Sequence, residues 1–110
     1  MTQENMQFEF QGFNPDPNTR TLISTIAERI HLNAPSDSAL KLALLRGKDA
    51  IRVSCRIVSR VGTFVAEAVS DSPRRALKQV EQKMRVQLDQ WKSWRFQNKL
   101  NKKTPLQTFQ

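Results

Sequence analysis

The C-terminal part of the chain contains its longest periodic run, and this run limits the folds that the sequence can adopt. From residue 73 to about residue 96, apolar side chains recur every three or four positions, at Leu77, Val80, Met84, Leu88 and Trp91. Positions with this spacing share one face of an α-helix. A helix with a single apolar face needs a second layer to cover that face, so the rest of the chain has to supply one.

Four shorter segments supply the predicted layer, because each alternates apolar with polar residues as a half-buried strand does. They comprise residues 6–13, 39–45, 51–60 and 63–69. In the third segment, for example, Ile51, Val53 and Cys55 point to one side. Short turns at residues 46–49 and 61–62 indicate that the last three strands form antiparallel hairpins. Periodicity alone leaves a helix over the short 39–45 run as an alternative.

Another helix is predicted between the first two strands. Asp16 and Pro17 are residues that cap and open a helix, and the sequence NAP at residues 33–35 ends it. Its apolar face contains Leu22, Ile23, Ile26 and Ile30. The element order β-α-β-β-β-α predicts a two-layer α+β fold, with a four-stranded sheet and both helices on one face. We predict one domain over residues 1–96 and a flexible basic tail over residues 97–110.

The formal net charge is +8, and the excess lies almost entirely in the C-terminal part. Residues 1–70 carry eight Lys and Arg against seven Asp and Glu, whereas residues 71–110 carry ten against three. Such a basic surface favours a polyanionic partner, with nucleic acid first and an anionic membrane second. Because the excess begins at the C-terminal helix, that helix is the predicted contact surface. The alternative is an ordinary charged helix that is solvated.

Two arginines follow directly after the start of this helix. Ser72 is a suitable cap and Pro73 fits the first helical position, but Arg74 and Arg75 come where the helix dipole is positive. A cation there costs about 0.3–1 kcal/mol. The free N–H groups of a helix start attract phosphate, and an arginine adds a planar fork that grips it. We interpret the pair as a phosphate site; alternatively, both side chains extend into water, which screens the penalty.

The polar side of the helix carries the residues predicted to bind RNA, which are Arg74, Arg75, Lys78, Lys83, Arg85 and Lys92. All except Arg75 and Lys83 fall within about 40° of one another and extend over about 27 Å, long enough to follow several phosphates. Arg75 flanks this stripe, and Lys83 lies on the opposite flank of the helix. Glu81 and Asp89 interrupt the stripe.

A second group of cations lies outside the C-terminal helix. Arg29 is on the exposed side of the first helix, and Arg52, Arg56 and Arg60 share the outward side of the 51–60 strand. Arg29, Arg52 and Arg56 are the candidates for a secondary RNA-binding surface, and the alternative for the strand arginines is the solvated side of an antiparallel sheet. For the strand arginines we favour the solvated side.

The sequence shows no recognisable catalytic motif. His31 is the single histidine and Cys55 the single cysteine, too few for a typical zinc site, and the three glycines match no phosphate-binding loop. We therefore expect no enzyme activity, cofactor, metal or small-molecule substrate. Cys55, Trp91 and Trp94 are predicted to pack in the core. With neither a secretory leader nor a membrane span recognisable, we expect a cytoplasmic monomer.

The segment FVAEAVSDSPRRALKQVEQKMRVQLDQW resembles the ribosome hibernation-promoting factor family, also called ribosome-associated inhibitors and sigma modulation proteins. The matching positions are Ala66, Ala68, Ser70, Asp71, Ala76, Lys83, Gln87 and Leu88. The resemblance implies the same element order and binding to ribosomal RNA of the small ribosomal subunit. It also implies that the protein occupies the channel used by tRNA and mRNA, and so inhibits translation under stress or in stationary phase. Lys83 matches a lysine of the family.

The chain departs from the family pattern at Ser72, Pro73 and Arg74, where members carry an acidic residue and a Met-Tyr pair. The second domain of long members is not recognisable either, so the resemblance implies a short or divergent form. Two alternatives remain at this point. A double-stranded RNA-binding domain also ends in three strands and a helix with a basic start. A protein-interaction adaptor would use the charge only for solubility.

Overall fold

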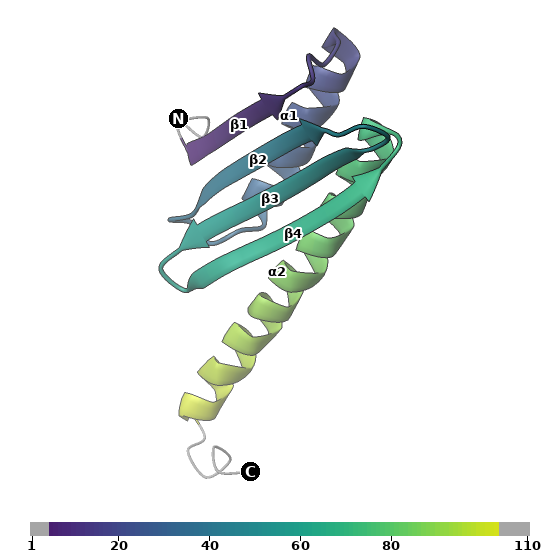
Figure 1. Ribbon diagram of the computed structural model, residues 1–110. Helices are drawn as coiled ribbons and strands as arrows, with labels where there is room; N and C mark the ends of the chain where they lie inside the picture. The colour runs from purple at the N-terminus through teal and green to yellow at the C-terminus, as the bar shows by residue number, and fades with distance from the viewer. Residues whose placement is uncertain (1–4, 104–110) are drawn as a thin grey trace.

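The computed structural model describes residues 5–103 and contains a four-stranded sheet with two helices on one of its faces (Figure 1). The elements are β1 (Met6–Gln11), α1 (Pro17–Leu32), β2 (Ala39–Arg46), β3 (Ile51–Ser59), β4 (Gly62–Ser70) and α2 (Pro73–Lys103). Both the order of the elements and the two-layer α+β fold are therefore confirmed. The alternative of a helix over 39–45 is wrong, because these residues form β2.

The sheet has the strand order β1-β2-β3-β4. The pairs β2–β3 and β3–β4 are antiparallel hairpins, as the short turns predict. In the first turn the Gly47 amide donates to the Ala50 carbonyl at 2.7 Å, and in the second Gly62 adopts a φ of 140°. Strand β1 is parallel to β2, with Met6 opposite Leu40, because the chain crosses through α1 between them. This topology leaves β1 and β4 as the two edges.

The core lies between the sheet and the helices. It is built from the inward residues of β2, β3 and β4 and from the apolar faces of α1 and α2; its largest fully buried side chains are Ile23, Ile26, Leu40, Leu42, Leu44, Ile51, Val53, Ile57, Leu77, Val80, Met84 and Leu88. Cys55 is completely buried among them, and burial raises the pKa of its thiol to about 12. The predicted core position of Cys55 is therefore confirmed.

Helix α1 begins and ends where the sequence predicts. The Asp16 carboxylate accepts a hydrogen bond from the Thr19 backbone amide at 2.9 Å, and the side chain of Thr19 together with this amide lowers the pKa of Asp16. At the other end the Asn33 amide donates to the Ile30 carbonyl at 3.1 Å. The helix thereby presents its isoleucines to the core and leaves Arg29 on its exposed side.

Helix α2 is longer than the apolar pattern predicts. The Ser72 hydroxyl accepts from the Arg75 amide at 3.4 Å, which confirms the capping role, and the helix extends past residue 96, where the apolar pattern ends. The helix continues through Lys103 and passes beyond the sheet (Figure 1). There it has no layer to cover an apolar face, so the chain needs no apolar repeat. Of the predicted tail, residues 97–103 are helical, and residues 104–110 lie outside the described part.

Candidate nucleic-acid interface

The predicted stripe of cations lies on the flank of α2 that faces α1. Lys78 and Arg85 line a groove with Arg29 of α1. Further along α2, the Lys92 ammonium donates to the Asn33 side-chain oxygen at 2.8 Å, directly after the end of α1. The stripe therefore borders the junction of the two helices, and both helices contribute to one basic surface.

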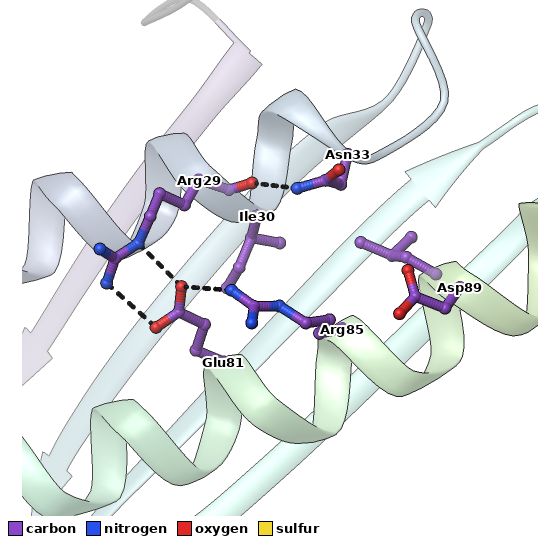
Figure 2. Close-up of a pocket in the computed structure, with 7 residues that line it drawn as sticks. Arg29, Ile30, Asn33, Glu81, Arg85 and Asp89 are labelled. Atoms are coloured by element: carbon purple, nitrogen blue, oxygen red, sulfur yellow. Dashed lines mark hydrogen bonds and ion pairs between the residues drawn. The ribbon is translucent and has the colours of Figure 1, made fainter.

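A carboxylate lies at the centre of this surface. Glu81 of α2 accepts two hydrogen bonds from Arg29, with Nε at 2.8 Å from Oε2 and Nη2 at 3.1 Å from Oε1. Arg85 approaches the same Oε2 with its Nη2 at 3.5 Å (Figure 2). The Glu81 side chain is only 12% exposed, whereas those of Arg29 and Arg85 are 50% and 55% exposed. One buried carboxylate thus holds two half-exposed arginines from two helices.

This cluster was only partly predictable. Arg29 belongs to the secondary group predicted from the sequence, yet the structure places it beside Lys78 and Arg85 of the primary group. Glu81 is interpreted from the sequence as an interruption of the stripe, but it connects the cations on either side of it. The periodicity of α2 carries no signal for a partner on α1, because contacts between helices depend on how they pack.

The two arginines at the start of α2 extend the basic surface along the helix. Both are exposed, and Arg75 lies 3.6 Å from the carboxylate of Asp71 in a solvent-exposed ion pair. Within the described part of the chain, Arg74 has no hydrogen bond or ion pair. Arg74 is therefore a cation at a helix start whose charge no neighbouring carboxylate neutralises.

Lys83 is separated from the other predicted residues by the width of the helix. Its ammonium donates to the backbone carbonyl of Glu67 in β4 at 2.7 Å. One turn further, the Gln87 amide donates to the carbonyl of Val65 at 2.6 Å. Both acceptors belong to the strand at the edge of the sheet, so Lys83 and Gln87 cap that edge.

The strand arginines lie on the open face of the sheet, opposite to the helices. Arg52 forms an ion pair with Glu67 at 3.1 Å, and Arg56 has no ion pair with the side chains of residues 5–94. Arg60 is not part of this face, because β3 ends at Ser59 and Arg60 lies in the turn beside Asp37. The two basic surfaces point in opposite directions and cannot grip one groove of an RNA together.

The two tryptophans of α2 occupy different environments. Trp91 is half-buried and meets Phe64 of β4 edge-on, with the ring centroids 6.2 Å apart. Trp94 is 62% exposed, so the prediction that it packs in the core is wrong. Helix α2 runs antiparallel to β4, which begins at Gly62, so Trp94 lies past the end of the strand that would cover it.

The fold of this chain defines a class of small α+β domain that other solved structures share. One is a ribosomal subunit interface protein from Coxiella burnetii, with 22% identity, a TM-score of 0.69, and coverage of 80% of this chain and 97% of that one. Another is the N-terminal domain of Protein Y from Thermus thermophilus, with 10% identity, a TM-score of 0.66, and coverage of 77% and 94%. The likeness shows a common fold.

Comparisons of sequence add nothing to this fold match, because neither a family model nor a curated protein matches the chain. Among residues 5–103, no helix combines the length and apolar character needed to cross a membrane.

Proposed function

We propose that this protein is a cytoplasmic, non-enzymatic inhibitor of translation that binds ribosomal RNA of the small subunit. It occupies the channel of tRNA and mRNA when cells are under stress or in stationary phase. The inhibition is by occupancy: a compact basic domain fills a site that tRNA and mRNA otherwise use. No cofactor is needed for this mechanism, and one copy of the chain is sufficient.

One observation carries the proposal: a basic surface at the junction of α1 and α2 occurs on the fold of a ribosomal subunit interface protein. That fold is shared over 80% of this chain. The exposed cations of the surface extend from Arg74 and Arg75 through Arg85 to Lys92. The resemblance of residues 64–91 to hibernation-promoting factors supports the same partner independently of the charge.

Sedimentation with purified small ribosomal subunits tests this function. The wild-type protein is expected to co-sediment at low salt and to dissociate as salt rises, since each phosphate contact adds about −0.7 to −0.9 to the logarithmic salt slope. Arg74→Glu with Arg75→Glu should abolish co-sedimentation, because the variant replaces two cations at the start of α2 with anions. A wild-type protein that stays at the top of the gradient contradicts the proposal.

The matched control is Arg56→Glu with Arg60→Glu, which changes the net charge equally but lies away from the helices. It should sediment like the wild type if RNA contacts neither the open sheet face, which holds Arg56, nor the turn after β3, which holds Arg60. Loss of binding in both variants would mean that overall charge, rather than the helix surface, drives association. Tight binding of a plain RNA duplex at physiological salt, with weak binding to subunits, would instead indicate a double-stranded RNA-binding protein. Complexes that survive nuclease treatment would indicate a protein adaptor.

A further inference from the structure

The cluster of Arg29, Glu81 and Arg85 poses a question that a simple basic surface does not answer. A binding surface for RNA gains from every cation, yet a carboxylate lies in the middle of this one. We propose that Glu81 is a positioning residue, which holds Arg29 and Arg85 as a two-armed clamp for one phosphodiester group of RNA. This inference rests on the proposed function and assigns a specific contact within it.

The two guanidinium groups keep free donors after they bind Glu81. An arginine has five N–H donors in a planar fork. Arg29 uses Nε and Nη2 for the carboxylate, and Arg85 uses Nη2, so Nη1 of both residues and Nε of Arg85 remain available. Both side chains are about half exposed. The remaining donors can therefore reach an anion in the groove between the helices.

The charge of the groove suits a phosphate group. Its lining consists of Arg29, Lys78, Glu81, Gln82 and Arg85. Three cations and one carboxylate leave a net charge of +2, which exceeds the single negative charge of a phosphodiester. Gln82 adds an uncharged donor at the rim. Glu81 thus removes one charge without making the groove neutral.

The Glu81 carboxylate compensates for that lost charge because it holds the two arginine side chains in place before the ligand binds. A free arginine loses rotamer entropy when it grips a ligand, and a side chain already held in place loses less. The two arms come from elements far apart in the sequence, so only the folded pair of helices brings them together (Figure 2). Asp89, one turn beyond Arg85, lines the same junction and forms no ion pair with the side chains of residues 5–94. Its carboxylate therefore holds neither arginine in place.

A comparison of Glu81→Gln with Asp89→Asn distinguishes the positioning role of Glu81 from the effect that its negative charge has on RNA affinity. Each variant removes one negative charge from the same side of α2. If Glu81 only neutralised its neighbours, both variants would bind purified small subunits more tightly. Positioning predicts that Glu81→Gln binds about tenfold more weakly, the loss of roughly one charge-assisted contact, while Asp89→Asn binds as well as or better than the wild type. Unchanged or tighter binding by Glu81→Gln overturns the clamp and leaves the proposed function intact.

Arg29→Lys provides a second variant in case Glu81→Gln perturbs the fold. It keeps the charge but removes the planar fork, so the clamp predicts an affinity loss of about tenfold with circular dichroism unchanged. An Arg29→Lys protein that binds like the wild type contradicts the clamp.

Nuclear magnetic resonance of the arginine Nε–H groups tests the proposed clamp in the absence of ribosomes. Titration of the wild type with a short RNA hairpin should shift the Arg29 and Arg85 signals together, with one apparent affinity. In Glu81→Gln the two signals should respond weakly and separately. If the wild type binds the hairpin in this way but not small subunits, the clamp stands and the ribosomal function is wrong. If neither signal shifts in the wild type, the clamp is wrong.

Discussion

The two flanks of α2 both carry cations, but they use them differently. On the α1 flank, Arg85 shares the side chain of Glu81 with Arg29 and keeps most of its donors free. On the β4 flank, Lys83 donates to a backbone carbonyl at 2.7 Å, next to the bond from Gln87. Glu81 holds Arg85 where its remaining donors can reach a ligand. The backbone carbonyl of Glu67 instead engages Lys83 in a contact that stabilises the fold.

Geometry explains why the β4 flank is so regular. Four residues of an α-helix rise by about 6 Å, and two residues of a strand by about 6.6 Å. Lys83 and Gln87 are four apart, and their acceptors Glu67 and Val65 are two apart in the opposite direction. Because helix and strand run antiparallel, the two periods match along the edge. The edge strand is therefore covered by its own neighbouring helix, which is one way that proteins block unwanted strand pairing.

The largest expected difference between the flanks is in binding. Lys78→Glu with Arg85→Glu should lower the affinity for small ribosomal subunits by about a hundredfold, since two contacts with charged groups are lost. Lys83→Gln, which keeps a donor for the Glu67 carbonyl, should change the affinity by less than about twofold. Titration of labelled protein with purified subunits measures both. Equal losses in the two variants would erase the distinction between the flanks.

For Lys83, the resemblance to a family suggests a contact with RNA, whereas the structure shows a contact with β4. This difference shows what the sequence can and cannot predict. Lys83 and Gln87 match family positions, and the sequence alone suggests an RNA contact for the lysine. The hydrogen bonds to β4 give the same two positions a role in the fold. For a lysine next to a basic stripe, the sequence carries no signal that separates these two roles, because the acceptor of its hydrogen bond is a main-chain oxygen.

The fold itself was predictable to a large extent. The alternation at Ile51, Val53 and Cys55 predicts β3 from the sequence, and all three residues are buried in the structure. The prediction of burial from periodicity fails in the part of α2 that extends past the sheet. Trp94 continues the helical spacing but lies past β4, and the helix continues to Lys103, beyond the end of the apolar pattern. Likewise, the Arg29–Glu81 pair spans 52 residues, and no local pattern encodes how α1 lies on α2.

A smaller effect concerns stability on the β4 flank. Lys83→Ala with Gln87→Ala removes two hydrogen bonds, so the free energy of unfolding should fall by about 1–3 kcal/mol, while subunit binding at a temperature where the variant is folded is retained. The uncovered carbonyls of β4 also favour pairing with another chain. Urea unfolding and sedimentation velocity measure the two consequences. A variant as stable and as monomeric as the wild type would show that the edge needs no cap.

The smallest expected effect has the opposite sign and lies at the start of α2. Arg74 faces the positive end of the helix dipole and has no ion pair within the described residues. Arg74→Glu should therefore raise the free energy of unfolding by about 0.3–1 kcal/mol in low salt, with the gain shrinking as salt screens the dipole. The same variant should bind small subunits more weakly than the wild type. A residue that stabilises the complex but destabilises the free protein serves ligand binding. If Arg74→Glu instead lowers the free energy of unfolding, Arg74 contributes to the fold, as Lys83 and Gln87 do on the β4 flank.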